Sequence, residues 1–273
     1  MEFKNTQIMP HKDDAFKDDK LQRKEYAEVL TSIIQSYGKG FVMSLDGVWG
    51  SGKTTFVKMW QAYLEGTDRE YQTLYFNAWE NDFEDDVLIA LLAQLKDLEN
   101  KGEKTFKEVL KKGTPLVKKF IPVLLKSTGK KYLGDDAVDF VQAAIEGTTD
   151  ILNDELDAYL AKRNSINQFK RQLNLFAIEA GDSKPVIFFI DELDRCRPDY
   201  AVRVLETVKH LFSVENIVFV LSIDKKQLSH SIRGFYGSEA INAEEYLTRF
   251  IDLEYSLPEP KKIDFISMLY DDF

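Results

Sequence analysis

The sequence predicts an α/β fold in which one parallel five-stranded sheet carries helices on both faces, and three observations lead to it. Five short apolar runs alternate with stretches of helical periodicity along the 273 residues. The runs are apolar without alternation, which is typical of strands buried on both faces. Strands separated by helices need crossover connections, so they pair in parallel, with the helices packed above and below the sheet.

The individual elements follow from these patterns in chain order. Apolar residues at helical spacing before Gly38 predict the first helix, and Pro198 suits the opening turn of a later one. The expected helices cover residues 21–38, 53–64, 85–98 and 198–212, and the expected strands cover residues 41–45, 73–79, 186–191, 216–224 and 249–258. Residues of about 100–180 are charged and mostly helical by pattern, and form an insert. Residues 1–20 are polar and are expected to be a poorly ordered lead.

Composition and charge bound the function. The formal net charge of −10 argues against broad nucleic-acid binding. One basic segment stands out at residues 101–131, where ten lysines against two glutamates give a net charge of +8. This segment either binds an anionic surface, lipid or nucleic acid, or packs into the core of the insert. No apolar run could span a bilayer and no signal core is present, so we expect a cytoplasmic protein, peripheral to a membrane at most.

The first expected strand leads into the pattern G-x-x-x-x-G-K-T, with Gly47, Gly52, Lys53 and Thr54 at the defining positions. Glycines allow positive-φ turns and remove Cβ atoms, so backbone N–H groups can surround a phosphate where the next helix begins. Lys53 would place its charge on the β- and γ-phosphates of a nucleotide, and the Thr54 hydroxyl would bind Mg²⁺. The expected nucleotide-binding loop comprises Gly47, Val48, Trp49, Gly50, Ser51, Gly52, Lys53, Thr54 and Thr55.

Two acids, Asp191 and Glu192, stand at the end of the third expected strand. The carboxyl end of a parallel strand would bring Asp191 close to the Mg²⁺ held by Thr54. Glu192 would turn to a different side and polarise the water that attacks a γ-phosphate. A buried strand that ends in a charged, solvated turn is the plain alternative, and the glycine loop upstream favours the catalytic interpretation.

The fourth expected strand ends on Ser222 and Asp224, at the edge of a parallel sheet where ligands bind. One interpretation is that these residues sense the γ-phosphate. The other is an ordinary strand-to-helix turn in which Asp224 caps the next helix. The sequence leaves both open.

Three further residues carry expectations about packing. Cys196 is expected to be a packed residue rather than a reactive thiol, with a pKa lowered by the flanking Arg195 and Arg197. Phe76 and Trp79, at the end of the second expected strand, are expected in the core.

Five stretches together resemble the KAP family of P-loop NTPases, over residues 21–258 apart from the insert. They are DGVWGSGKTTF, LYFNAWE, FFIDELDRCRP, FVLSIDKKQL and YLTRFIDLEYSLP, in this order. The resemblance implies a three-layer P-loop NTPase with the strand order 5-1-4-3-2, which binds ATP with Mg²⁺ and hydrolyses it. It implies that residues 259–273 begin a helical lid that is truncated or missing. Many bacterial members of the family belong to anti-phage or other conflict systems.

The same resemblance assigns roles to single residues. Leu21 and Arg23 correspond to a segment that lies by the adenine in related ATPases, although Gln22 stands where those have glycine. Arg249 corresponds to an arginine that related ring-forming ATPases extend into the site of a neighbouring subunit. Arg195 is the alternative and would act within its own chain; the plain alternative for both arginines is a surface ion pair.

The leading interpretation is therefore an ATP-hydrolysing regulatory switch that self-associates and is coupled to an effector protein. Two others stay open. One is an ATP-binding scaffold with negligible turnover, and the other is a nucleic-acid-dependent motor that uses the basic segment at residues 101–131.

Overall fold

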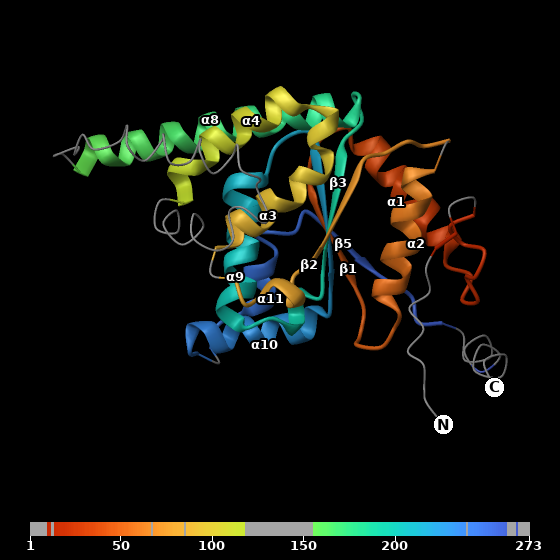
Figure 1. The fold of residues 1–273 in the computed structure, drawn as a ribbon. Coiled ribbons are helices and arrows are strands. Elements are labelled where there is room, and N and C mark those ends of the chain that lie inside the picture. The colour runs from red at the N-terminus through yellow and green to blue at the C-terminus, as the bar shows by residue number, and fades with distance from the viewer. Residues whose placement is uncertain are drawn as a thin grey trace.

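The computed structural model describes residues 10–11, 14–66, 68–84, 86–117, 155–238, 240–260 and 266. These residues form three layers, a central sheet with helices on both faces, as Figure 1 shows. Within the described ranges, no helix is long and apolar enough to cross a membrane. The predicted three-layer α/β architecture is confirmed.

The sheet has five strands, and every neighbouring pair is parallel. They are β1 (Val42–Asp46), β2 (Thr73–Asn77), β3 (Val186–Asp191), β4 (Ile217–Ile223) and β5 (Leu253–Ser256). Their order is β2-β3-β4-β1-β5. Read from β5, this is the predicted order 5-1-4-3-2. The fifth strand is shorter than the predicted 249–258, because residues 248–250 form a turn before it.

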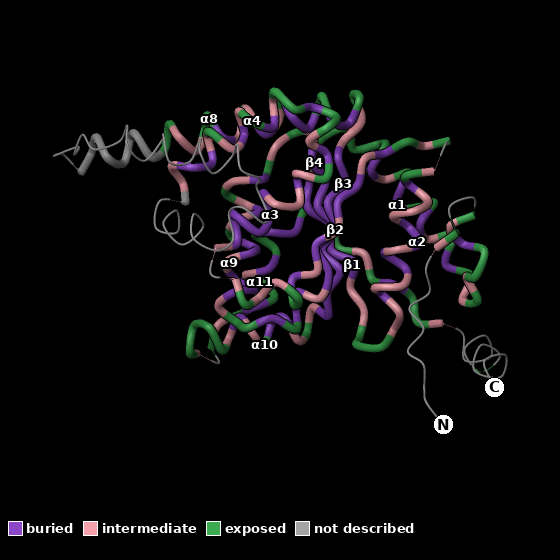
Figure 2. Tube along the Cα trace, viewed as in Figure 1, coloured by how far each residue is buried: buried purple, intermediate pink, exposed green. Residues whose placement is uncertain are grey.

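Helices bury both faces of the sheet. One face carries α1 (Lys24–Tyr37) and α2 (Lys53–Glu65), and the other carries α3 (Val87–Leu95), α9 (Pro198–Thr207), α10 (Lys225–Tyr236) and α11 (Ala243–Leu247). Alternate residues of β4 divide between the two cores: Phe219 packs under the second group, whereas Val218 and Val220 pack under α1 and α2. Figure 2 shows the buried chain concentrated along the strands. Burial on both faces explains why the strands read as continuous apolar runs.

Because all five strands run in one direction, the sheet has a carboxyl edge, where every strand ends, and an amino edge, where every strand begins. The helices α2 and α10 start at the carboxyl edge, directly after β1 and β4. Each crossover helix then returns the chain to the amino edge before the next strand. Polar residues that end strands therefore collect at the carboxyl edge.

The insert lies at the amino edge, because it joins the end of α3 to the start of β3. Its described elements are the 3₁₀ turns η2 (Lys96–Lys101) and η3 (Thr114–Val117) and the helices α4 (Glu103–Gly113) and α8 (Glu155–Gly181). The two helices lie side by side (Figure 1), and the ring centroids of Phe106 on α4 and Phe176 on α8 are 5.6 Å apart. The insert is thus attached on the side of the sheet opposite the strand ends.

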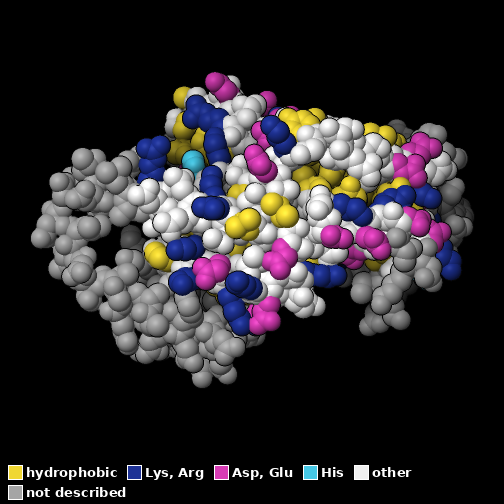
Figure 3. Space-filling model, turned by 90° about the horizontal axis from the view of Figure 1, so that it is seen from above, with side chains coloured by type: hydrophobic (Ala, Val, Ile, Leu, Met, Phe, Trp, Pro, Cys, Tyr) yellow, Lys and Arg dark blue, Asp and Glu magenta, His cyan; other side chains and the backbone are white. Residues whose placement is uncertain are grey.

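The predicted basic segment, residues 101–131, is described only as far as residue 117. In that part Lys107 pairs with Glu103 and Lys111 pairs with Glu108. Figure 3, seen from above the helices α4 and α8, shows acidic and basic side chains interspersed over this face. Binding of an anionic surface stays a prediction, because residues 118–131 of the segment lie outside the described residues.

The segment before α1 contributes to the core. Residues 1–20 were expected to be a poorly ordered lead, but Phe16 is buried. Its ring lies 6.4 Å from that of Phe56 and 5.7 Å from that of Tyr63, both on α2. The end of the lead packs there because one aromatic side chain covers an aromatic surface of α2 that would otherwise face water.

Candidate active site

The glycine loop connects β1 to α2, and its three glycines serve different needs. Gly50 and Gly52 have φ angles of +77° and +82°, a conformation that glycine adopts without strain. Gly47 has no such angle, but a Cβ atom there would lie 3.0 Å from the Ser51 hydroxyl oxygen. The loop also closes on itself, since Ser51 N–H donates to the Val48 carbonyl at 3.2 Å.

The start of α2 is an open anion site. Gly52 precedes the helix and offers no capping side chain, so the N–H groups of Lys53, Thr54 and Thr55 in the first turn lack an intrahelical partner. These N–H groups carry the positive end of the helix dipole. An anion bound there would satisfy both the unpaired donors and the dipole.

Lys53 adds a full charge to the same place. Its side chain is buried, and Nζ donates to the carbonyl oxygens of Gly47, at 2.5 Å, and Val48, at 3.2 Å. Among the described residues no carboxylate forms an ion pair with Lys53. A buried ammonium group with only carbonyl partners leaves its charge uncompensated, so a phosphate would be a strongly favoured partner.

Strand register brings the predicted acid to this loop. Asp191 pairs with Asn77 of β2 on one side and with Ser222 of β4 on the other, and Ser222 pairs in turn with Leu45 of β1. Asp191 is 1% exposed, and its carboxylate accepts hydrogen bonds from the Tyr75 hydroxyl at 3.0 Å and from the Glu192 N–H at 2.9 Å. Burial, and next the charge of Asp191, raise the pKa of Tyr75, which therefore remains a donor.

Glu192 stands in the left-handed region, with φ of +60°, which turns it away from the strand. One carboxylate oxygen accepts from the Asn77 amide at 3.1 Å, and the other lies 3.0 Å from an Arg195 guanidinium nitrogen. The guanidinium carbon of Arg195 also lies 5.5 Å from the ring centroid of Trp79. Both oxygens that could polarise a water are thus occupied by neighbouring side chains.

A tryptophan joins the glycine loop to the acidic turn. Trp49 is about half exposed, and its indole N–H donates to the buried Asp194 carboxylate at 2.5 Å. Asp194 lies in η5 (Leu193–Arg195), directly after the acid pair. Movement of the glycine loop would therefore displace Asp194 and, through the same turn, the neighbouring Arg195 and Glu192.

The prediction that Trp79 lies in the core is wrong, whereas the same prediction for Phe76 is confirmed. Phe76 is 1% exposed and Trp79 is 50% exposed. The reason is that β2 ends at Asn77, two residues earlier than predicted, and Trp79 begins the 3₁₀ turn η1 (Trp79–Asn81) at the carboxyl edge. Trp79 therefore flanks the acid pair instead of supporting the sheet.

Cys196 is buried as predicted, but its pKa is shifted in the opposite direction. Burial is the first cause of the rise and the nearby Asp82 carboxylate is the second. The flanking arginines do not offset this, because Arg195 pairs with Glu192 and the Arg197 guanidinium donates to the Asp82 carbonyl. The thiol is packed and stays protonated.

Ser222 and Asp224 separate in the structure. Ser222 is fully buried beside Asp191, and within the described residues its hydroxyl oxygen has no hydrogen-bond partner. Asp224 accepts from the Gln227 N–H at 3.1 Å and caps α10, which favours the capping interpretation for that residue. An unpartnered hydroxyl in a row of site residues favours a sensing role for Ser222.

The segment before α1 reaches the loop through one arginine. Arg23 is buried, and its guanidinium donates to the carbonyls of Ser51, at 2.7 Å, and Gly52, at 3.2 Å. Gln22 has φ of +54°, a conformation that glycine adopts without strain. Leu21 is half-buried, and its backbone N–H donates to Asp19.

Arg249 lies away from this site. It is exposed in the turn before β5, and its carbonyl accepts from Lys209, which follows α9 near the amino edge. The five residues of β1 separate the two edges by roughly 15 Å. Arg249 therefore lies at the edge of the sheet opposite the glycine loop of its own chain.

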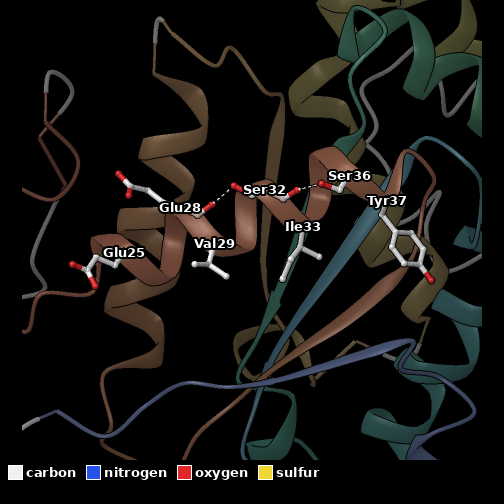
Figure 4. Close-up of a pocket in the computed structure, with 7 residues that line it drawn as sticks. All are labelled: Glu25, Glu28, Val29, Ser32, Ile33, Ser36 and Tyr37. Atoms are coloured by element: carbon white, nitrogen blue, oxygen red, sulfur yellow. Dashed lines mark hydrogen bonds between the residues drawn. The ribbon is translucent and has the colours of Figure 1, made fainter.

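Two surface hollows have different chemistry. One of about 510 Å³ adjoins the glycine loop and is lined by Gly47, Trp49, Asp224, Lys226 and Ser256, among others. The other, of about 590 Å³, lies on the outer side of α1 (Figure 4), and its lining offers no cation: Glu25, Glu28, Val29, Ser32, Ile33, Ser36 and Tyr37. Only the first lies beside the phosphate-binding groups.

Tyr75, Asn77 and Asp194 complete the site, and the sequence analysis did not identify them. Asn77 had a signal, since it is a polar residue at the carboxyl end of a buried strand. Tyr75 and Asp194 had none, because their partners are 116 and 145 positions away.

Comparison with known proteins identifies the family of the chain. The model of the KAP family P-loop domain matches residues 23–273. No curated protein matches the chain. Among solved structures, the ORC2 protein of Aeropyrum pernix, determined as ADPNP-ADP complexes, is 16% identical with a TM-score of 0.40; the match covers 92% of this chain and 51% of that one. The chain thus spans about half of that protein. With the family model matched over nearly the whole described domain, this chain belongs to the KAP family of P-loop NTPases.

Proposed function

We propose that this protein binds ATP together with Mg²⁺, hydrolyses it, and works as a regulatory switch. One observation carries the proposal: Lys53, buried and without a carboxylate partner in the described chain, lies at the uncapped start of α2. The row of Asp191 and Ser222 ends at the same edge of the sheet. A polyphosphate fits this combination of a charge, free N–H groups and a loop whose three glycines lack Cβ atoms.

The residues present also fit a magnesium ion. Thr54 offers a hydroxyl in the first turn of α2, and Asp191 offers a carboxylate whose partners are donors that an ion could replace or share. Mg²⁺ bound with the nucleotide would neutralise charge on its phosphate oxygens. Thr54 and Asp191 would hold the ion, and Lys53 would hold the phosphates.

Hydrolysis requires Glu192 to leave its present partners. A carboxylate whose two oxygens are held by Arg195 and Asn77 is poorly placed to take a proton from a water. Release of Arg195 would free one oxygen and one positive charge together. The switch would then have a resting state, with Glu192 paired, and an active state in which Glu192 faces a water.

Two features of the proposal concern partners. Arg249 would complete the site of a second copy, since it is exposed and far from its own loop, so activity would depend on self-association. By family resemblance, the output would be an effector protein in a conflict system such as anti-phage defence.

A second candidate, an ATP-binding scaffold with negligible turnover, is favoured by the same paired state of Glu192. A phosphate-release assay separates the two. The switch predicts magnesium-dependent release that Glu192→Gln abolishes while ATP binding persists. The scaffold predicts ATP binding with no release above that of Glu192→Gln. Adding DNA, RNA or anionic liposomes tests the motor and the basic segment, which predict stimulation.

A further inference from the structure

Arg23 binds the glycine loop on the side that faces away from the positive end of the α2 helix dipole. Its two terminal guanidinium nitrogens donate to consecutive carbonyls, those of Ser51 and Gly52, at 2.7 and 3.2 Å. The Gly52 carbonyl also accepts from Phe56 N–H at 3.0 Å, the first hydrogen bond of α2. A planar guanidinium with two parallel donors fixes both peptide planes at once.

The orientation of those carbonyls sets the orientation of the groups that would bind phosphate. In a trans peptide the C=O group and the following N–H group point in opposite directions. Fixing the Ser51 and Gly52 carbonyls toward Arg23 therefore points the N–H groups of Gly52 and Lys53 the other way. These are donors of the open start of α2, where an anion would bind.

The surroundings show that loop and guanidinium are fitted to each other. A Cβ atom on Gly52 would lie 3.0 Å from the nearer guanidinium nitrogen, so any other residue would press on the guanidinium. The Asp19 carboxylate accepts the backbone N–H groups of Leu21, Arg23 and Lys24, which fixes the segment that carries the arginine. Arg23 is 4% exposed, so water competes little for the two carbonyls.

We propose that Arg23 is a positioning residue, which orients the N–H groups of the glycine loop toward the phosphates and does not itself contact the nucleotide base. This inference rests on the proposed binding of ATP. It differs from the role that family resemblance implies, in which the segment lies by the adenine. The two roles predict different ligand dependence, because only a base contact requires a base.

The test compares ATP with inorganic tripolyphosphate, which carries the phosphates without the base. Calorimetry measures the affinity of the wild type, Arg23→Met and Arg23→Lys for both ligands, and thermal unfolding monitors stability. If Arg23 orients the loop, Arg23→Met weakens both ligands by the same factor, at least roughly tenfold, as the fraction of competent loop falls to a tenth. Arg23→Lys recovers part of the loss, because one ammonium group can hold one carbonyl.

Arg69→Met is the matched control. Arg69 stacks on Tyr63 at 3.6 Å, near the far end of α2, and donates to its hydroxyl. Its loss is expected to lower stability and leave both affinities unchanged. If Arg23→Met does not fold, Arg23→Lys alone decides, because a positioning role still predicts equal weakening of both ligands.

Three outcomes overturn the inference and differ from one another. Weakening of ATP alone assigns Arg23 to the base. Unchanged affinities with lowered stability assign it a structural role like that of Arg69. If the wild type binds neither ligand, the proposed function fails first and the positioning role fails with it.

Discussion

The two edges of the sheet differ in what the chain places there. At the carboxyl edge, strand ends deliver Asp191, Ser222 and the glycine loop, and side chains from distant segments bond to them. At the amino edge, the apolar strand β3 follows α8 of the insert, which packs against α4 through aromatic rings such as those of Phe106 and Phe176. The carboxyl edge is thus polar and suited to binding, whereas the amino edge is apolar and accommodates an insert.

This separation has a physical cause. A parallel sheet places the N-termini of the helices that follow its strands at its carboxyl edge, so anion binding is concentrated there. An insert at the other edge can lengthen without moving those groups, because it adds to the core from outside. Substitutions at the carboxyl edge should therefore change activity, and substitutions in the contact between α4 and α8 should change stability.

Lys53→Ala should give the largest change, a loss of phosphate release of roughly a hundredfold or more with weaker ATP binding. The substitution removes the buried charge at the start of α2. Lys58→Ala on the same helix, whose ammonium group lies 5.7 Å from the Tyr75 ring centroid, is the control and should hydrolyse ATP normally. Normal turnover in Lys53→Ala would contradict the assignment of the whole edge.

Glu192→Gln should lower turnover by roughly 10²- to 10⁴-fold and keep ATP bound, because an amide cannot act as a base. Asp191→Asn should instead shift the magnesium concentration that activity needs. Titration of phosphate release with Mg²⁺ and direct ATP binding distinguish the two. Equal loss of ATP binding in both variants would show that the acids do not divide their roles as proposed.

Arg249→Ala tests whether the two edges meet between copies of the chain. Alone, it should lose turnover; mixed with Glu192→Gln it should regain part, because some interfaces combine an intact Glu192 with an intact Arg249. A mixture of Lys53→Ala and Glu192→Gln is the control and should regain nothing, since both residues belong to one site. Normal turnover of Arg249→Ala as a demonstrated oligomer would shift attention to Arg195, which lies 3.0 Å from Glu192.

Phe106→Ala on α4 should destabilise the protein by about 3 to 5 kcal/mol, because it leaves a cavity against Phe176 on α8. Unfolding by denaturant measures the change, and ATP affinity of the folded fraction should not move. Leu175→Ala on α8 is the control, since that side chain is 42% exposed and should cost much less. A weaker ATP affinity in Phe106→Ala would show that the insert at the amino edge influences binding at the carboxyl edge, and would contradict the separation of the two edges.

Sequence patterns predicted the parts of this molecule that depend on local signals. The glycine loop and the position of Asp191 follow from motifs whose residues lie within a few positions of one another, whereas the strand order was implied by the family resemblance. The pairs Tyr75–Asp191 and Trp49–Asp194 depend on how distant segments meet, which no local pattern encodes. Trp79 was misplaced because apolar composition does not mark where a strand ends.

Cys196 and Arg23 show that local sequence does not predict the electrostatic surroundings of a side chain either. Two flanking arginines suggested a lowered thiol pKa, but burial and the Asp82 carboxylate raise it. The resemblance places Arg23 in a segment near a base, and no local signal indicated that its guanidinium meets two carbonyls 28 and 29 positions along the chain. The sequence shows which residues carry a charge. It does not show which of these charges are buried away from water, or which groups surround them.

Gln22→Gly should give the smallest effect, a gain in stability of about 1 kcal/mol. Gln22 adopts φ of +54°, and a side chain in that region costs about 1 to 2 kcal/mol relative to glycine. The greater freedom of glycine in the unfolded chain offsets part of the gain. Glu25→Gly in α1, where the backbone is helical, should instead lose about 1 kcal/mol.

Denaturant unfolding of the two glycine variants measures both changes, and ATP binding adds the functional reading. Because Asp19 accepts the N–H groups of Arg23 and Lys24, Gln22→Gly should keep Arg23 on the loop carbonyls and leave ATP affinity unchanged. A stabilised variant that binds ATP less well would mean that the strained backbone at position 22 itself presses Arg23 against the loop. In that case the strained conformation of Gln22 contributes to nucleotide binding at the carboxyl edge.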